Sequence, residues 1–313
     1  MPASRLAVIQ KSTIVRSFSL LERVAPWLGA RWAERLWFTV PRARGQRDGQ
    51  AGPGRPFRVQ LASRSVAGEV WGEEPVQEPP DPGRLAGRGG RPVVYLVHGW
   101  GGWRRQLDAF VGPLVEAGWR VVAFDAPGHG DSDPGPEGPG RSTILEFAGA
   151  LAAVVTAHGQ AAAVVAHSLG ATAAAFAMEG GLAVERAVFL APMADPLPYT
   201  RTFAGRLGFG ERIRTRLVRR VERRVGMPMS AFDVPAMSSR AATPPLLLVH
   251  DRQDAETGWS DSAAIARSWP GSRLVTTAGL GHRRILRAPA VVAEVAGFVT
   301  GAGAGQTGLR LAR

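Results

Sequence analysis

Short, uninterrupted apolar runs recur along this chain and are separated by longer segments. The runs are Val93 to Val97, Arg120 to Phe124, Ala162 to Ala166, Ala187 to Ala191, Leu246 to Val249 and Leu274 to Thr277. A continuous apolar run of this length is typical of a strand that is buried on both faces of a parallel sheet. The segment Leu107 to Ala117 is amphipathic and follows the first run, as a crossover helix would. The order strand, helix, strand therefore predicts a parallel sheet covered by helices.

Two more strands and a capped helix complete this pattern. Phe57 to Ser63 and Val66 to Trp71 have the composition of a short hairpin, which brings the sheet to about eight strands. Thr143 and Glu146 form a capping box at the start of a helix that Gly159 ends. The predicted fold class is α/β, doubly wound, with a mostly parallel sheet formed by residues 56–192 and 241–300.

Strand signals are missing between Met193 and about Arg240, and we expect residues 193–240 to form a helical cap. Within it, apolar residues recur every four positions at Ile213, Leu217, Val221 and Val225. Arginines fill most of the positions between them. The simpler interpretation is a charged helix with one buried side, and the alternative is an electropositive lid that attracts anionic substrates or lipid headgroups.

The N-terminal residues 1–55 are expected to form a helical extension. Pro26 divides its periodic part, up to about residue 42, into two helices. Packing against a core is the favoured role of these helices. The alternative is an interfacial membrane contact, because tryptophans alternate with arginines in the order Arg23, Trp27, Arg31, Trp32, Arg35 and Trp37. Residues 43–55 and 72–91 are expected to be loops, and residues 301–313 a flexible tail.

Composition limits the chemistry and the compartment. The 313 residues include no cysteine, which excludes disulfides and thiolate sites, and a formal net charge of +12 is carried almost entirely by arginine. That charge is compatible with acidic substrates or an anionic membrane, but it does not indicate specific binding to a nucleic acid. No apolar run approaches the length of a spanning helix. We therefore expect a cytoplasmic protein, with a peripheral position at the membrane as the alternative.

The segment Ala166-His167-Ser168-Leu169-Gly170 has the pattern of a nucleophile elbow, a sharp turn from a strand to a helix. Such a turn holds a serine hydroxyl clear of its neighbours, where a base reaches it. Gly170 fits the pattern, whereas Ala166 replaces the first glycine. Taken alone, the segment is equally compatible with a buried strand end.

Other polar residues follow the predicted strands, where the loops of a parallel sheet converge on one crevice. They are His98 with Gly99, the segment Asp125 to Ser132, Asp254 and His282. With these residues in place, the chain resembles the α/β-hydrolase superfamily from about residue 56 to residue 300. The order Ser168, Asp254, His282 is similar to the serine, acid, histidine order of that superfamily.

The resemblance implies a catalytic role for each member of this set. Ser168 is the expected nucleophile, His282 the general base and Asp254 the acid that orients it. Asp251 and Asp195 are reserve candidates for the acid. Five histidines compete with His282 but have simpler structural interpretations: His98, His129, His158, His167 and His250. The resemblance also implies backbone donors for an oxyanion at Trp100 and Leu169.

No histidine or carboxylate cluster has metal-ligand spacing and no strand-linked G-x-G-x-x-G segment precedes an acidic partner, so we expect no metal and no cofactor. The resemblance gives the segment Asp125 to Ser132 no catalytic role. We expect a serine hydrolase that cleaves an ester, thioester or similar acyl bond of a small-molecule substrate. Two alternatives are a non-catalytic scaffold that binds a ligand, because fold does not guarantee chemistry, and a lipid hydrolase at the membrane surface.

Overall fold

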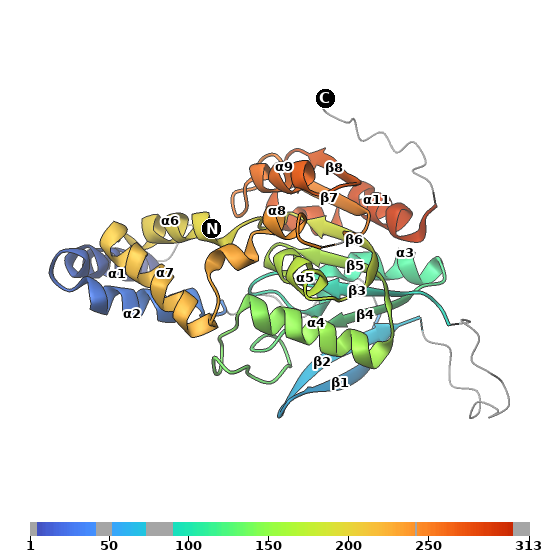
Figure 1. Ribbon diagram of the computed structural model, residues 1–313, viewed down its shortest axis with the longest axis horizontal. Helices are drawn as coiled ribbons and strands as arrows, with labels where there is room; N and C mark the ends of the chain where they lie inside the picture. The colour runs from blue at the N-terminus through green and yellow to red at the C-terminus, as the bar shows by residue number, and fades with distance from the viewer. Residues whose placement is uncertain (1–4, 42–51, 73–89, 242, 303–313) are drawn as a thin grey trace. The chain divides into compact units, whose positions relative to one another are not determined.

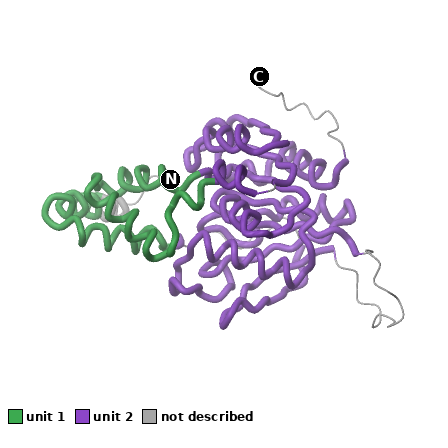
Figure 2. The backbone as a smooth tube through the Cα atoms, viewed as in Figure 1, with its two compact units in different colours: residues 1–39, 195–233 green, residues 40–194, 234–313 purple. Residues whose placement is uncertain are grey.

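A computed structural model describes residues 5–41, 52–72, 90–241 and 243–302. The chain divides into two compact units, shown in Figure 2. The core unit comprises residues 40–194 and 234–313, and the helical unit comprises residues 1–39 and 195–233. Most of the predicted loops at 43–55 and 72–91, and of the tail from residue 301, lies outside the described residues. The domain boundaries drawn from the sequence stay predictions.

The core unit is built on one eight-stranded sheet (Figure 1), in the order β1-β2-β4-β3-β5-β6-β7-β8. The strands are β1 (Arg55–Leu61), β2 (Arg64–Trp71), β3 (Val93–Val97), β4 (Arg120–Phe124), β5 (Ala161–His167), β6 (Val184–Leu190), β7 (Leu246–Asp251) and β8 (Ser272–Thr277). The first two strands pair antiparallel with each other, and β2 pairs antiparallel with β4. All other neighbours run parallel. The predicted fold class, including its eight strands and N-terminal hairpin, is confirmed.

Helices cover both faces of this sheet. They are α3 (Val111–Glu116), α4 (Ile144–His158), α5 (Leu169–Glu179), α8 (Val234–Met237), α9 (Trp259–Ser268), α10 (Gly281–Arg284) and α11 (Pro289–Thr300), with the 3-10 turns η1 (Arg104–Phe110) and η3 (Ile285–Arg287). Alternate strand residues such as Val94 and Leu96 pack into one apolar cluster with η1, α3 and α11. The helices α4, α5 and α9 pack on the sheet separately from that cluster. The expected single helix at 107–117 is instead the 3-10 turn η1, whose backbone is kinked at Leu107, followed by α3.

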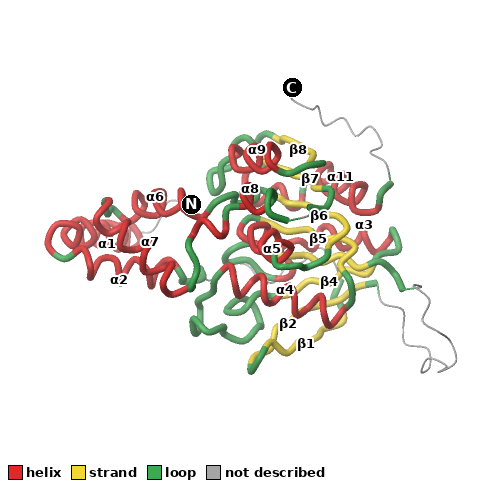
Figure 3. The backbone as a smooth tube through the Cα atoms, viewed as in Figure 1, coloured by secondary structure: helices red, strands yellow, loops and turns green. Residues whose placement is uncertain are grey.

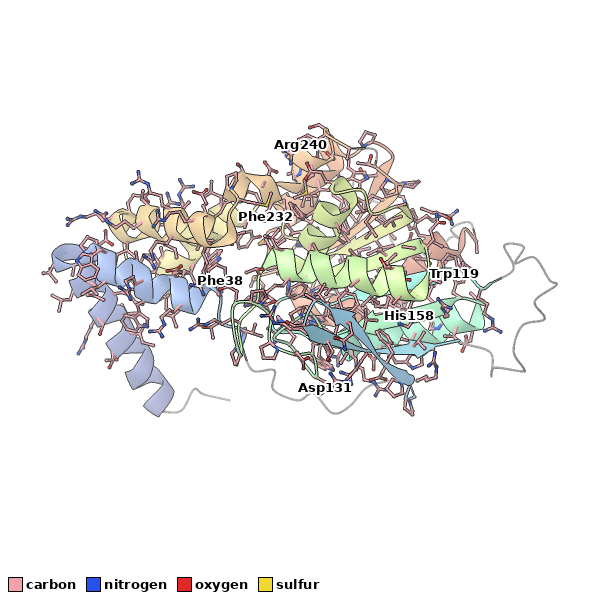
Figure 4. The ribbon with its side chains drawn as sticks, turned by 60° about the horizontal axis from the view of Figure 1, so that its bottom comes forward. Phe38, Trp119, Asp131, His158, Phe232 and Arg240 are labelled. Carbon is pink, nitrogen blue, oxygen red and sulfur yellow. The ribbon has the colours of Figure 1, made fainter. Side chains whose placement is uncertain are left out.

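Helix α4 begins and ends where its sequence signals predict. The Thr143 hydroxyl accepts a hydrogen bond of 3.2 Å from the Glu146 amide, and Gly159 ends the helix with a φ of 106°. At its C-terminal end, labelled in Figure 4, the ring of His158 lies 4.2 Å from the ring of Phe57 on β1. His158 therefore has a packing role in the core unit.

The helical unit combines two segments that are far apart in the sequence. It contains α1 (Arg5–Val24), α2 (Pro26–Trp37), α6 (Pro196–Leu207), α7 (Glu211–Val225) and the 3-10 turn η2 (Met229–Phe232), as Figure 3 shows in red. The predicted division at Pro26 is confirmed. Both segments contribute to one buried interior, made of Phe18, Ala30, Ala33, Phe38, Ala204, Phe209, Ile213, Leu217, Val221 and Met229.

Polar contacts join the same two segments. The Glu22 carboxylate of α1 accepts hydrogen bonds from the amides of Arg212 and Ile213, at 2.9 and 3.1 Å, in the first turn of α7. A carboxylate at this position satisfies amides that have no partner within the helix and lies favourably in the helix dipole. The buried Glu34 of α2 is paired with Arg220 of α7 at 2.6 Å. The N-terminal helices and the inserted helices therefore form one folded body.

Candidate functional site

Ser168 lies at the turn between β5 and α5, at the middle of the sheet. Its φ of 54° and ψ of −124° fall outside the regions that non-glycine residues prefer, which is the strained backbone expected of a nucleophile elbow. The strand is held on both sides by β3 and β6. Surrounding structure of this kind is what maintains such strain. The Ser168 residue is only 9% exposed.

The elbow packs closely against the loop that follows β3. A Cβ added to Gly170 would lie 2.3 Å from the carbonyl oxygen of His98. A Cβ added to Gly99 would lie 2.8 Å from His167 Nδ1 and 3.0 Å from Ser168 Cβ. Both positions therefore require glycine, and the loop after β3 lies directly beside Ser168. Ala166, which replaces the usual first glycine, lies buried within β5.

Asp254 and His282 are in direct contact. His282 Nδ1 lies 2.7 Å from Asp254 Oδ2, and the Asp254 carboxylate is fully buried. The amides of Glu256 and Thr257 donate to the other oxygen, Oδ1, at 2.7 and 3.0 Å. The structure thus places the two predicted partners together, although one follows β7 and the other follows β8.

Burial would raise the pKa of Asp254, but hydrogen bonds from His250 and His282 outweigh it and hold this pKa well below its usual value. The carboxylate is therefore ionised at neutral pH. In this state it accepts the Nδ1 proton of His282, which leaves Nε2 as the nitrogen with a free lone pair.

His167 connects Ser168 to the segment that carries His282. Its ring lies 4.5 Å from the His282 ring, and its Nε2 donates to the His282 carbonyl oxygen at 3.1 Å. Burial lowers the pKa of His167 well below the ordinary histidine value, so the ring stays neutral. His167, the residue immediately before Ser168, thus holds the backbone of His282 in place. Sequence reasoning gave His167 only a structural role in the elbow.

His250 also reaches the acid. Its Nε2 lies 3.4 Å from Asp254 Oδ2 and 3.2 Å from the Thr257 carbonyl, and its Nδ1 lies 2.7 Å from the Ser262 hydroxyl. An Nε2–H tautomer satisfies all three contacts, with the serine hydroxyl donating to Nδ1. His250 is fully buried at the end of β7. Its place four residues before Asp254 was the only sequence signal for this contact.

The two reserve acids have other partners. The buried Asp251 accepts hydrogen bonds from the Thr277 hydroxyl at 2.8 Å and from the Leu280 amide at 2.9 Å, so it holds the loop that leads to His282. Asp195 accepts from the Leu197 amide at 2.8 Å as the N-cap of α6. The carboxylate that contacts His282 Nδ1 is that of Asp254.

The loop after β3 is held in place by two buried histidines. His129 Nε2 accepts a hydrogen bond from the Gly101 amide at 3.1 Å, and His98 Nε2 accepts one from the Ala126 amide at 3.0 Å. Burial lowers the pKa of His129 to about 3 and that of His98 to about 4. Both rings are therefore neutral acceptors above acidic pH. The segment from Asp125 to Ser132, which we expected to be only a structural turn, supports the loop through His129.

Arg104 anchors the other end of the same loop. Its guanidinium pairs with Asp125, with Glu69 at 2.8 Å and with Asp131 at 2.7 Å. Its amide donates to Asp125 at 2.6 Å. Leu169 follows Ser168 directly and is the first residue of α5, so its amide has no acceptor within that helix.

Within the described residues, no group of three or more histidine and acidic side chains is arranged to hold a metal ion. The described helices also include none with both the length and the apolar character needed to cross a bilayer.

Comparison with known proteins places the chain in a family. The sequence profile of the Alpha/beta hydrolase family matches residues 94–295, the segment that carries Ser168, Asp254 and His282. This protein belongs to the alpha/beta hydrolase family. Two solved structures are similar to it in fold. Est1E from Butyrivibrio proteoclasticus has a TM-score of 0.55 at 18% identity over 78% of this chain and 96% of that one. A Pyrococcus furiosus esterase has a TM-score of 0.57 at 17% identity over 84% of this chain and 96% of that one.

Curated relatives match shorter segments. A dihydrolipoyllysine-residue acetyltransferase component of the acetoin cleaving system from Cupriavidus necator is 39% identical over 32% of this chain and 24% of its own length. A pimeloyl-[acyl-carrier protein] methyl ester esterase from Neisseria meningitidis is 51% identical over 12% of this chain and 15% of its own. The chain thus spans about a quarter or less of these relatives.

Proposed function

We propose that this protein is a cofactor-independent serine hydrolase that cleaves an ester or related acyl bond of a small molecule. The observation that carries the proposal is the hydrogen bond of 2.7 Å between His282 Nδ1 and the buried Asp254 carboxylate, with the His282 ring 4.5 Å from that of His167, the residue before the strained Ser168. When a buried, ionised carboxylate binds Nδ1–H of a histidine, Nε2 of the same ring is free to act as a base.

In the first half of the reaction, Ser168 Oγ attacks the acyl carbon and its proton passes to His282 Nε2. The imidazolium that forms is stabilised by Asp254, which stays ionised. His282 then gives the proton to the leaving alcohol, and the bond between the acyl carbon and the alcohol oxygen breaks. The acyl group is left as an ester of Ser168.

In the second half, His282 takes a proton from water while the water oxygen attacks the acyl carbon. The bond to Ser168 Oγ breaks, the serine recovers its proton from His282, and a carboxylic acid leaves. In both halves the carbonyl oxygen becomes an oxyanion. We assign the stabilisation of this oxyanion to the backbone amides of Trp100 and Leu169. Loss of one such donor typically lowers the rate by about 100-fold or more.

The compared proteins support an ester as the scissile group. One curated relative is a methyl ester esterase, and the similar structure from Pyrococcus furiosus is an esterase. The substrate proposal is therefore stated as a reaction type, the hydrolysis of an ester. We also propose a cytoplasmic location, on the basis of the sequence alone.

A cap role for the inserted helices is part of the proposal. The chain leaves the core unit after Ala194 and returns at Val234, where the Val234 amide donates to the Ala194 carbonyl at 2.8 Å. Both ends of the insertion thus meet just after β6, on the edge of the sheet where Ser168 follows β5. Substrate selection by a segment inserted at this edge is expected of an open α/β sheet.

Hydrolysis of p-nitrophenyl esters of graded acyl length tests the proposal. The wild type is expected to turn over at least one of these esters, and Ser168→Ala is expected to lose that turnover while keeping its circular dichroism spectrum. A wild type inactive on every acyl length, and unreactive toward a fluorophosphonate, would favour the alternative of a non-catalytic ligand-binding scaffold. Equal turnover by both proteins would place the chemistry elsewhere.

A further inference from the structure

Large apolar side chains are exposed together where α1 meets α2. Among the described residues, five large hydrophobic side chains are exposed, and four of them lie within a stretch of nine residues in the helical unit. These four are Leu20 at 60%, Val24 at 69%, Trp27 at 57% and Leu28 at 42% exposure. We call them the apolar corner. Exposed apolar groups that gather in this way mark an interaction surface more often than groups scattered singly.

The apolar corner is not needed for the interior of the helical unit. The opposite sides of α1 and α2 supply that interior through Phe18, Ala30 and Ala33, which are fully buried. Phe18 stacks on Trp32 at a ring distance of 4.4 Å. The two helices therefore each have a buried apolar side and a second apolar group facing solvent, which folding alone does not explain.

Positive charge surrounds the apolar corner. Exposed arginines lie three or four residues from its members: Arg16 and Arg23 near Leu20, and Arg31 near Trp27 and Leu28. Residues at these spacings are neighbours on a helix surface. Among the residues that the structure describes, Arg23 and Arg31 have no ion-pair partner. Their charges are available to a partner outside the chain.

The whole helical unit has the same bias. Residues 1–39 and 195–233 contain 15 of the 38 lysines and arginines of the chain but only 6 of its 26 aspartates and glutamates. This quarter of the sequence therefore carries most of the net charge of +12. A field of this sign attracts anionic surfaces over a range of about 10 Å at moderate salt.

We propose that the apolar corner and its arginines dock on the surface of an anionic lipid bilayer. Trp27, Leu28, Leu20 and Val24 enter the boundary between headgroups and acyl chains, while Arg23 and Arg31 contact lipid phosphates. A tryptophan beside leucines, ringed by arginines, matches the composition of interfacial helices. An acidic protein would match the arginines but gives no reason for four exposed apolar side chains. The proposal is independent of the reaction assigned to Ser168.

Flotation of the full-length protein with vesicles tests this proposal. We expect it to float with vesicles of phosphatidylcholine and phosphatidylglycerol, and to stay at the bottom with phosphatidylcholine alone. Raising the salt concentration weakens flotation because screening reduces the attraction of the arginines. A variant with Leu20→Ser, Val24→Ser, Trp27→Ser and Leu28→Ser, and a second with Arg23→Ser and Arg31→Ser, are both expected to stay at the bottom.

Matched variants control for loss of apolar area and of charge elsewhere. Leu197→Ser removes the fifth exposed hydrophobic, and Arg267→Ser with Arg287→Ser removes two exposed charges from the core unit. Both controls should float like the wild type, and all variants should keep the wild-type circular dichroism spectrum.

Three outcomes would overturn the proposal. In the first, the wild type stays at the bottom with both kinds of vesicle. In the second, the apolar-corner variant floats as well as the wild type, which would indicate nonspecific adsorption by charge. In the third, the wild type does not float but sediments as a dimer that the apolar-corner variant does not form, which would make the corner a contact between copies of this chain.

Discussion

His250 Nε2 and His282 Nδ1 approach the same oxygen of Asp254, at 3.4 and 2.7 Å. The acid thus lies between two histidines, one buried at the end of β7 and one on α10. Since a second donor withdraws charge from the carboxylate, His250 affects how strongly Asp254 stabilises the imidazolium of His282. It acts on the proposed reaction through Asp254 and is a positioning residue.

Replacing His250 is expected to change the pH dependence of the reaction. His250→Phe removes the second donor, so the carboxylate attracts the proton on His282 more strongly and the acidic limb of the kcat/KM profile moves to higher pH. The unpaired Ser262 hydroxyl also costs about 1–3 kcal/mol of folding stability. His250→Gln keeps an amide donor and should restore most of the wild-type profile. A stability loss with no movement of the profile would leave His250 a purely structural role.

Asp254→Asn is expected to lower kcat by about four orders of magnitude with little effect on KM, because the amide favours the wrong tautomer of His282. Steady-state hydrolysis of an active ester measures this. Asp251→Asn serves as the comparison. It weakens the hydrogen bonds to Thr277 and Leu280, so we expect a loss of stability and a much smaller loss of kcat. The reverse ranking of the two variants would make Asp251 the acid.

Gly99→Ala is expected to abolish most of the activity of a protein that still folds. The added methyl would lie 2.8 Å from His167 Nδ1 and 3.0 Å from Ser168 Cβ, and the loop after β3 has to shift to relieve both contacts. Gly149→Ala is the matched control, because its methyl meets nothing within 4 Å on α4 and alanine favours a helix interior by roughly 0.5–1 kcal/mol. Kinetics and thermal unfolding of both variants check this. Normal activity of Gly99→Ala would show that the loop tolerates displacement.

Acid is expected to destabilise the core unit through its buried histidines. The pKa of His129 is lowered from 6.5 to about 3 by burial, so the unfolded chain binds its proton more readily than the folded one. The free energy of unfolding is unaffected by His129 above pH 6.5, where the ring is neutral in both states. Below pH 6.5 it decreases by about 1.4 kcal/mol per pH unit until the pH approaches 3. His98 adds a similar loss between pH 6.5 and about 4.

Urea unfolding of the wild type and of His129→Phe between pH 7.5 and pH 4.5 separates this effect from other titrations. The variant should show a shallower dependence on pH, although it is less stable at neutral pH. Equal slopes for the two proteins would contradict the assignment of neutral His129.

The sequence predicted the central strands because each contains a short apolar run. The resemblance to a known family then singled out Ser168, Asp254 and His282, each of which follows such a run. The sequence did not predict the supporting contacts. His129 and Gly101 are 28 residues apart, and no periodicity relates them. The same holds for the two segments of the helical unit, where Glu22 of α1 caps α7 across 190 residues of chain.

The short distance between His250 and Asp254 in the sequence did carry a signal. The pair is separated by a turn just after β7, and the two side chains are both buried there. A buried histidine needs partners for both ring nitrogens, and an acid four residues away is one of the few available. The simpler interpretation of a strand-end histidine was favoured because burial is not visible in a single sequence.

Covalent labelling by a fluorophosphonate, located by mass spectrometry of the digested protein, tests the central claim most directly. A phosphonate forms a stable adduct only with a serine that has been activated by a base. We predict a single adduct on the peptide that contains Ser168, formed much more slowly in His282→Ala and absent in Ser168→Ala. An adduct on another residue, or a wild type that remains unlabelled, would contradict the assignment of Ser168 as the nucleophile.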